Sequence, residues 1–400
     1  MRGNLFETTR LLRFSRNDNL LSLDFGSNNM SENFIRDIAD KIDKGVRLSR
    51  EDAVALMESN DLISIGQLAN KVKEKKSGAN AYFNVNRHIN LTNICVSRCK
   101  FCAFSRDKKD PDAYAMTIDD VLGIARSARD TGITEFHIVS GLHPDLPFDY
   151  YLQIVSTLKQ AMPEVHIKAF TAVEIDYFSK ISHLTIREVL TELQKAGLGS
   201  LPGGGAEILH ARVRDLVCPQ KASAKEWLRV MRTAHSLGLK SNATMLYGHI
   251  ETIQERIDHL LTLRDLQDET GGFQAFIPLP FHPRNTQLSD VQKPTAFESL
   301  KMLAISRLVL DNFPHIKAFW IMLGLKVAQL SLLFGVDDLD GTVVEEKITH
   351  SAGAETAQSV SREELLELIH ATGRVPVERD TLYNMLRIYD QNRKGVSVAT

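Results

Sequence analysis

Three of the four cysteines of this chain lie close together, at Cys95, Cys99 and Cys102, in the spacing C-x3-C-x2-C. Cysteine thiolates are the usual protein ligands of iron–sulfur clusters, and their spacing helps to separate cluster types. The C-x2-C-x2-C-x3-C-P pattern of bacterial ferredoxins is absent, and so is the second ligand pair of a structural zinc site. Three close cysteines without a local fourth therefore indicate a four-iron cluster with one iron open to a small molecule. A zinc knuckle and three buried thiols are the alternatives, and the distant Cys218 is predicted to be a buried or incidental thiol.

The composition argues against several classes of protein. The formal net charge is only −2, which disfavours a nucleic-acid or acidic-membrane partner bound through bulk electrostatics. No apolar run approaches the roughly 20 residues that span a bilayer, and no signal peptide is recognisable. The cysteines do not make a disulfide framework. We therefore expect a cytoplasmic protein without a nucleic-acid or membrane partner, in a compartment that suits an oxygen-sensitive cluster.

From residue 82 onward, short apolar strands alternate with amphipathic helices. About eight such βα units predict an α/β fold, a (β/α)8 TIM-type barrel. A doubly wound open sheet is the second choice, but no G-x-G-x-x-G motif follows the first strand. The expected strands are 82–91, 134–139, 166–170, a short one before Pro202, 241–246, 273–277 and 316–320, with the eighth strand and helix within 323–350.

The barrel is expected to carry N-terminal helical and C-terminal extensions. Residues 1–29 read as a disordered or non-native extension, and 30–80 as a helical segment that serves as a lid or plug. The barrel spans 81–350, and 351–400 form a C-terminal helical extension packed on it. Ser49 and Thr117 are predicted to cap the helices that follow them.

Polar or glycine-rich sequence follows nearly every predicted strand. In (β/α) barrels the active site lies at the C-terminal ends of the strands. One such segment could be ordinary turn chemistry, but six at the same end of a barrel indicate a site. They are the cysteine loop and the segments 140–144, 171–174, 202–207, 247–252 and 280–286.

The glycines at these positions have a physical use. Gly141 has no Cβ, so a ligand can approach its backbone closely. The glycine run 203–205 is interpreted in the same way, as an approach to ribose or substrate, with Glu207 available for hydroxyl groups. It could cradle a phosphate, but no G-K-[ST] sequence follows. The segment 247–251 suits adenine, and helix capping is the alternative for each carboxylate.

The histidines fall into two groups. Those within predicted strands are interpreted as core residues, and those at a strand end beside proline or glycine are candidates for function. The first group is His88, His137 and His166, and the second is His143, His249 and His282.

The cysteine spacing, with the aromatic Phe101 before the third cysteine, resembles the signature of the radical S-adenosylmethionine (SAM) enzymes. The resemblance implies a [4Fe-4S] cluster whose open iron chelates the methionine part of SAM. Electron transfer into the sulfonium then releases a 5′-deoxyadenosyl radical. Cys95, Cys99 and Cys102 would hold the cluster, and Ser140 stands where many members have glycine. The residues expected to bind SAM are Ser140, Gly141, Thr171, Glu174, Gly203, Gly204, Glu207, Tyr247 and Gly248.

Longer motifs narrow the resemblance to one subgroup, which contains menaquinone (futalosine pathway) enzymes and deazaflavin-forming synthases. The motifs that carry it are 93–95, 102–104, 202–207, 373–376 and 379–383. Within the subgroup, the sequences of 140–144, 168–174, 245–252 and 276–283 are most similar to the aminofutalosine synthases. The similarity covers about residues 31–390, and Pro280, where alanine is expected, is a mild departure.

This resemblance implies a definite reaction. The adenosyl radical adds to the enolpyruvyl double bond of 3-[(1-carboxyvinyl)oxy]benzoate, the aryl group migrates, and carbon dioxide or bicarbonate leaves. The products are 6-amino-6-deoxyfutalosine and methionine, and an electron donor such as flavodoxin or ferredoxin is expected. Because the substrate has two carboxylates, cationic or polar anchors are expected at the barrel mouth. The candidate catalytic residues are His143, His249, His282, Arg284 and Asn285.

Other functions stay open. A dehypoxanthine futalosine cyclase or a deazaflavin-synthase-like enzyme shares the cysteines and the glycine run. The cyclase would release the radical as 5′-deoxyadenosine. A non-catalytic metal-binding scaffold protein, with zinc on the cysteines, is the alternative from a different class.

Overall fold

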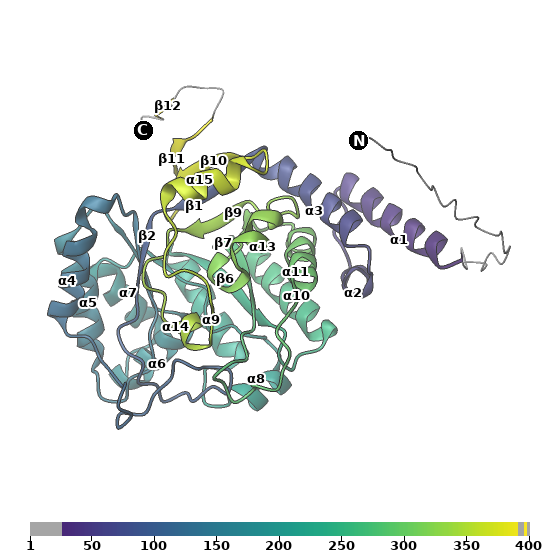
Figure 1. Ribbon diagram of the computed structural model, residues 1–400. Helices are drawn as coiled ribbons and strands as arrows, with labels where there is room; N and C mark the ends of the chain where they lie inside the picture. The colour runs from purple at the N-terminus through teal and green to yellow at the C-terminus, as the bar shows by residue number, and fades with distance from the viewer. Residues whose placement is uncertain (1–25, 391–395, 398–400) are drawn as a thin grey trace, which may run out of the picture.

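The centre of the fold is a curled sheet of seven parallel strands that follow one another in chain order (Figure 1). The computed structural model describes residues 26–390 and 396–397. The strands are β2 (Asn86–Ile89), β3 (Glu135–Ile138), β4 (His166–Ala169), β5 (Ser200–Leu201), β6 (Lys240–Tyr247), β7 (Phe273–Pro280) and β8 (His315–Ile316). This arrangement confirms the α/β barrel class.

The eighth position of the barrel is only partly filled. The segment 338–344 lies between the two edge strands of the sheet, β8 and β2. Asp338 makes an isolated parallel bridge to Lys317, and Val344 makes one to Arg87. The expected eighth strand is therefore the short β9 (Asp338–Gly341), which pairs mainly with a strand of a second sheet.

Helices cover the outer face of the curled sheet (Figure 1). They are α4 (Ile118–Ala128), α5 (Phe148–Ala161), α6 (Ala172–Ser182), α7 (Ile186–Ala196), α9 (Ala224–Ser236), α10 (Ile253–Thr270) and α11 (Ala296–Val309). Both predicted N-caps are confirmed, because Thr117 with Asp120 and Ser49 with Asp52 form complete capping boxes. α6 and α10 start just beyond the C-terminal ends of β4 and β6, so their N-termini lie near the predicted site.

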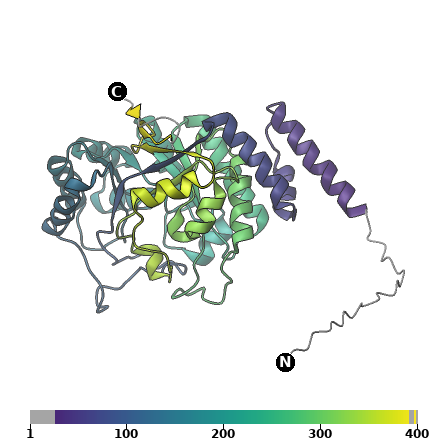
Figure 2. The same ribbon diagram turned by 45° about the horizontal axis from the view of Figure 1, so that its top comes forward.

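The N-terminal helices do not form a lid or plug, so this prediction was wrong. α2 (Arg50–Glu58) and α3 (Leu62–Ser77) pack on α10 and α11, outside the barrel wall. α1 (Gly26–Asp43) contacts α3 and lies at the margin of the molecule in Figures 1 and 2. Of the predicted extension 1–29, residues 1–25 lie outside the described residues. Among the described helices, none is long and apolar enough to cross a membrane.

A second sheet, at the N-terminal end of the barrel, joins a strand that precedes the barrel to strands that follow it. Its strand order is β12–β11–β10–β1–β9, with β1 (Asn80–Asn84), β10 (Val375–Arg379), β11 (Met385–Ile388) and β12 (Val396–Ser397). The expected helical extension is therefore wrong in part. Beyond residue 351 the described residues form one helix, α15 (Arg362–His370), and three strands. The predicted strand 82–91 divides at Val85 between β1 and β2.

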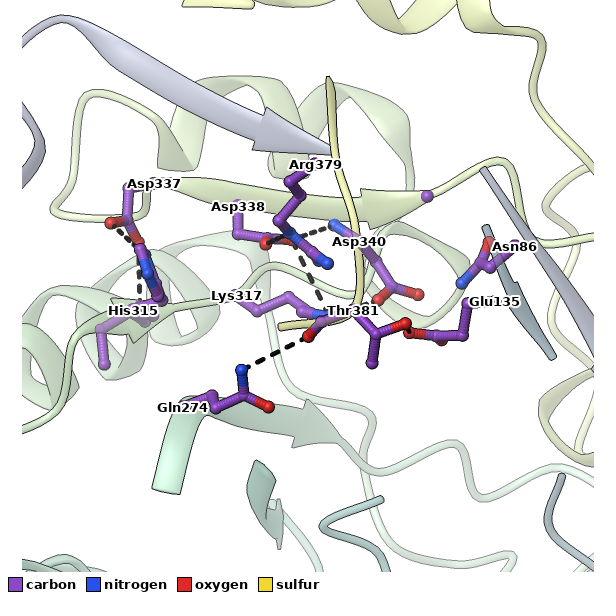
Figure 3. A network of polar contacts seen from close by, with 12 residues as sticks. Asn86, Glu135, Gln274, His315, Lys317, Asp337, Asp338, Asp340, Arg379 and Thr381 are labelled. Atoms are coloured by element: carbon purple, nitrogen blue, oxygen red, sulfur yellow. Dashed lines mark hydrogen bonds and ion pairs between the residues drawn. The ribbon is translucent and has the colours of Figure 1, made fainter. Parts of the chain in front are cut away.

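A buried polar network ties this second sheet to the barrel (Figure 3). Arg379 Nε donates to Asp338 Oδ2 at 2.6 Å, and both side chains are fully buried. Thr381 Oγ1 donates to Glu135 Oε2 at 2.8 Å. Gln274 Nε2 donates to the Thr381 carbonyl oxygen at 3.4 Å. Since Glu135 and Gln274 lie at the starts of β3 and β7, the network closes the base of the barrel, opposite the cysteines.

Candidate active site

A cavity of about 320 Å³ lies inside the barrel and reaches the C-terminal ends of the strands. Its wall joins the cysteine loop, the loops after β3 and β5, and polar residues within the strands. The predicted site residues that line it are Cys95, Cys99, Cys102, Ser140, Gly141, Thr171, Glu174, Gly203, Gly204, Glu207 and His282. The structure thus brings together most predicted cofactor residues and one of the five predicted substrate anchors.

The cysteine loop is held on two sides by backbone hydrogen bonds. The Val96 N–H donates to the Leu142 carbonyl oxygen at 3.0 Å, which fixes the loop to the segment after β3. The Lys100 N–H donates to the Val217 carbonyl oxygen at 2.8 Å, at the end of α8 (Ala211–Val217). Among the described residues, no three His, Cys, Asp or Glu side chains are grouped to hold a single metal ion. The backbone therefore positions the loop, and three separate thiols line the cavity.

Cys218 follows α8 and lies beside Cys99, with which it shares a hydrogen bond. That hydrogen bond, followed by burial, raises the pKa of the Cys99 thiol. Cys218 is buried, as predicted, and it does not line the cavity. Its closeness to a predicted cluster ligand could not be inferred from the distance between the two cysteines in the sequence.

Ser140 and Gly141 join the end of β3 to the start of the cysteine loop. The Leu91 N–H donates to Ser140 Oγ at 2.8 Å, and the Gly141 N–H donates to the Thr92 carbonyl oxygen at 2.9 Å. A Cβ on Gly141 would overlap the carbonyl oxygen of Ile94. Glycine is thus required at position 141 by the close approach of the cysteine loop, and the Ser140 hydroxyl is used to hold the end of β2.

Glu174 caps α6 and braces the loop after β3. Its Oε2 accepts the Thr171 N–H at 2.7 Å, and its Oε1 accepts the Ser140 N–H at 3.0 Å. Burial raises the pKa of Glu174 to about 7. The capping alternative therefore describes Thr171 and Glu174 well, although both residues also line the cavity.

The glycine run packs closely against its neighbours. A Cβ on Gly203 would lie 2.7 Å from the backbone of Ala243 in β6, so glycine lets this loop rest on the next strand. Glu207 Oε1 accepts a hydrogen bond from Lys221 Nζ at 2.5 Å. Lys221 also lies 5.3 Å from the ring centre of Phe101, in the cysteine loop. This carboxylate and ammonium pair forms the cavity wall next to the cysteines.

The segment after β6 does not line the cavity, contrary to the expected adenine contact. Tyr247 is fully buried, and the guanidinium of Arg256 lies 5.3 Å from its ring centre. The Gly248 N–H donates to Glu251 Oε1 at 2.5 Å. His249 contacts the Leu246 carbonyl oxygen through Nε2 at 3.1 Å. These three residues stabilise their own turn.

Three further predicted anchors also lie outside the cavity wall. His143 Nδ1 accepts the Asp145 N–H at 3.1 Å. Arg284 is exposed and pairs with Glu355 at 3.0 Å, and Asn285 donates to the Ser351 carbonyl oxygen at 3.1 Å. His282 does line the cavity, and its Nε2 contacts the Met322 carbonyl oxygen at 2.8 Å. Only His282 of this group is placed to meet a ligand in the cavity.

Sequence reasoning missed a polar layer within the strands. His88, His137 and Lys168 occupy matching positions of β2, β3 and β4 and line the cavity. His88 and His137 had been interpreted as core residues. The signal was present in the sequence, since three neighbouring strands each carry a basic or imidazole side chain at the same level. Other polar residues of the cavity wall that were missed are Asn242, Thr244, Asp340 and Glu346.

His350, which lies at the edge of this site, should make the stability of the fold depend on pH. Its Nδ1 lies 2.6 Å from the Glu346 carbonyl oxygen and its Nε2 lies 3.0 Å from the Thr356 carbonyl oxygen. Carbonyl oxygens only accept, so both ring nitrogens carry hydrogen. The hydrogen bond to Glu346 is the main cause that raises the pKa of His350 to about 9.

The protonated ring stabilises the fold fully below pH 6.5, its ordinary pKa, and the effect is lost as the pH rises through 9. We expect the unfolding free energy of the wild type to fall by about 1 to 2 kcal/mol more than that of His350→Gln over this interval, with allowance for solvent screening. Urea denaturation at several pH values measures the difference. Equal slopes for the two proteins would contradict the assignment.

Two comparisons of the sequence with known proteins decide the family. Residues 89–263 match the Radical SAM superfamily, and residues 270–392 match the CofH/MqnC C-terminal region. The aminodeoxyfutalosine synthase of Thermus thermophilus is 48% identical over 88% of this chain and 96% of its own length. That of Streptomyces coelicolor is 48% identical over 89% of this chain and 95% of its own length. This chain belongs to the radical SAM superfamily.

One further relative and two solved structures are also similar to this radical SAM enzyme. The 5-amino-6-(D-ribitylamino)uracil–L-tyrosine 4-hydroxyphenyl transferase of Methanopyrus kandleri is 40% identical over 88% of this chain and 95% of its own. The hydrogenase maturase HydG of Carboxydothermus hydrogenoformans has a TM-score of 0.69 at 18% identity, covering 90% of this chain and 82% of its own. Methylornithine synthase (PylB) has a TM-score of 0.68 at 16% identity, covering 85% and 97%. The two solved structures support the fold alone.

A [4Fe-4S] cluster and SAM are the cofactors of a radical SAM enzyme, and the cavity wall fits both. Three thiols supply the soft ligands that an iron–sulfur cluster needs, and the fourth cysteine lies outside the wall. The close packing at Gly141 keeps the wall beside the cysteines free of side-chain bulk. Backbone groups of two glycine-containing loops therefore face the same space as the thiols.

Proposed function

We propose that this chain is an aminofutalosine (aminodeoxyfutalosine) synthase of menaquinone biosynthesis. It would join the adenosyl group of SAM to 3-[(1-carboxyvinyl)oxy]benzoate and form 6-amino-6-deoxyfutalosine. The observation that carries this proposal is the 48% identity to the Thermus enzyme over 96% of that enzyme. Identity to the Methanopyrus transferase is lower, at 40%, which makes its chemistry the second candidate.

In this proposal Cys95, Cys99 and Cys102 hold the cluster. When bound there, the cluster with SAM supplies a carbon radical by one-electron reduction of the sulfonium, with flavodoxin or ferredoxin as the electron donor. The protein contributes binding, orientation and exclusion of water. Phe101, Phe281 and Phe319 line the cavity and provide apolar walls around the reacting atoms. A reducing compartment such as the cytoplasm suits three unpaired cysteines.

The chain's own residues would divide the cavity between two ligands. The loops at 140–141 and 203–204 are assigned to SAM, because they lie beside the cysteines and expose backbone groups. Lys221 Nζ donates a hydrogen bond to Glu207 Oε1. Glu207 Oε2 is therefore left to accept a hydrogen bond from a ribose hydroxyl. The polar layer inside the strands is farther from the cysteine loop and is left for the benzoate.

An anaerobic assay tests the proposal. Reconstituted protein is mixed with SAM, dithionite and 3-[(1-carboxyvinyl)oxy]benzoate, and the products are identified by mass spectrometry. We expect a product with the mass of 6-amino-6-deoxyfutalosine. Free 5′-deoxyadenosine with unchanged benzoate would move the substrate toward the cyclase or the transferase. No SAM cleavage by protein that carries its cluster would refute the proposal.

A further inference from the structure

The lower half of the cavity has a hydrogen-bonding group without a partner. His88 Nε2 is buried, and no described residue bonds to it. The His88 residue is 5% exposed and lines the cavity. Buried polar atoms in folded proteins almost always have a partner, so an orphaned one requires an explanation. A ligand that accepts a hydrogen bond provides it.

Further donors line the same cavity, and two of them share the register position of His88. His137 lies opposite His88 in the strand register, and the two rings stack with their centres 4.5 Å apart. Lys168 follows in register on β4 and donates to Glu135 Oε2 at 2.7 Å. An ammonium has three N–H groups, so Lys168 can serve another acceptor as well. Asn242 of β6 adds a side-chain amide to the cavity wall.

The acidic residues of the wall have partners that balance their charge. Asp340 Oδ1 accepts from Lys317 Nζ at 2.6 Å. Glu346 accepts two backbone N–H groups, and its nearest oxygen lies 3.4 Å from the ring of the protonated His350. These carboxylates therefore do not exclude an anion from the other side of the cavity. Among the described residues of the wall, the other buried side-chain atoms without a partner are the hydroxyls of Ser97 and Ser105, beside the cysteines.

The depth of this layer indicates which part of a ligand it meets. His88 lies within β2, whereas Cys95 follows the end of that strand, and each strand residue adds about 3.3 Å. The enolpyruvyl double bond must lie near the cysteines, where the SAM carbon radical would arise. The ring carboxylate is at the other end of the substrate and so points down the barrel. Phe319, whose ring is nearly parallel to that of His88, lines the cavity beside it.

We propose that His88, His137, Lys168 and Asn242 form the subsite for the ring carboxylate of the benzoate. His88 Nε2–H donates to the carboxylate, Lys168 supplies the charge, and the barrel interior rather than its mouth selects an aryl acid. This inference rests on the synthase function proposed above, because that function supplies the substrate. It replaces Arg284 and Asn285 as anchors for this carboxylate.

Binding calorimetry tests the subsite without turnover. Holoenzyme with SAM, and without reductant, is titrated with the substrate and with 2-phenoxyacrylate, which lacks the ring carboxylate. Loss of a hydrogen bond to a charged group weakens binding by about 10- to 100-fold. We expect this difference between the two ligands in the wild type. His88→Phe keeps the ring stacking. In this variant the affinity for the substrate should fall by a similar factor, and the affinity for 2-phenoxyacrylate should not change.

Two variants control the experiment. His88→Gln keeps an N–H donor and should restore part of the affinity. His166→Gln removes an imidazole of β4 that contacts Ser200 at 2.8 Å and does not line the cavity, so it should bind the substrate like the wild type. Equal affinity of wild type for both ligands, or an equal loss for both in His88→Phe, would overturn the subsite. A wild type that makes no adduct in the assay would instead refute the synthase function.

Discussion

Replacing Cys99 with alanine will abolish cluster binding and SAM cleavage, whereas replacing Cys218 with alanine will leave both close to wild-type levels. The two cysteines are hydrogen-bonded neighbours, so the pair compares two thiols in almost the same place. Of these two cysteines, Cys99 lines the cavity and Cys218 does not. Three protein thiolates leave one iron free for SAM, so a fourth protein ligand would be incompatible with the chemistry of the family.

Iron and sulfide content, visible absorbance and 5′-deoxyadenosine formation measure the effect. Thermal unfolding of both variants shows whether the fold is kept, since both residues are buried. Loss of the cluster in Cys218→Ala, with a folded protein, would show that Cys218 is a ligand. The assignment of an open iron would then be wrong.

The second large effect is expected at the base of the barrel. Arg379→Met should lower the free energy of unfolding by about 3 to 5 kcal/mol, because it leaves the buried Asp338 carboxylate without its main partner. Both side chains of this ion pair are fully buried, and Arg379 also lies 4.1 Å from the ring centre of Tyr383. Lys317, at 3.9 Å from Asp338, is too distant to replace the bond fully.

A matched control exists on the surface. Arg232 bonds Glu269 through two nitrogens, whereas Arg379 bonds Asp338 through Nε and the Asp380 carbonyl oxygen through Nη1. The Arg232 pair is about half exposed. Arg232→Met should cost less than about 1 kcal/mol. Urea denaturation followed by circular dichroism compares the two. Similar midpoints for both variants would mean that burial of the Arg379 pair contributes little to stability.

The features that the sequence predicts well are those with a local chemical signature. The cysteine spacing, the capping boxes at Ser49 and Thr117, and the alternation of strands and helices each depend on a few adjacent residues. The place of the cavity at the strand ends then follows from the barrel class. These parts of the structure agree with the analysis of the sequence.

The direction of a side chain could not be predicted in the same way. Strands of a parallel barrel are buried on both faces, so they lack the polar and apolar alternation that would mark the inward face. His88 and His137 were therefore assigned to the core. His143 and His249 lie at strand ends but bond their own turns, and proximity to a strand end does not fix where a ring points.

The strand β10 could not be predicted from its own residues, because it pairs with β1, which is far away in the chain. Val375 pairs with Asn80, and Pro376 lies within β10, between two neighbouring strands. Proline argues against a central strand, because it cannot donate to the ladder. A local pattern could not reveal that β10 pairs with the distant β1 on one side and with β11 on the other.

The pairing of β1 with β9 and β10 determines when the second sheet can form during synthesis of the chain. β1 is made early, but β9 and β10, its neighbours on either side, are made only after all seven strands of the curled sheet. At about 5 to 20 residues per second, β1 waits roughly 15 to 60 seconds as an unpaired edge. Nascent chains with such edges are prone to associate with one another. The floor of the barrel therefore forms only after the strands of its wall have been made.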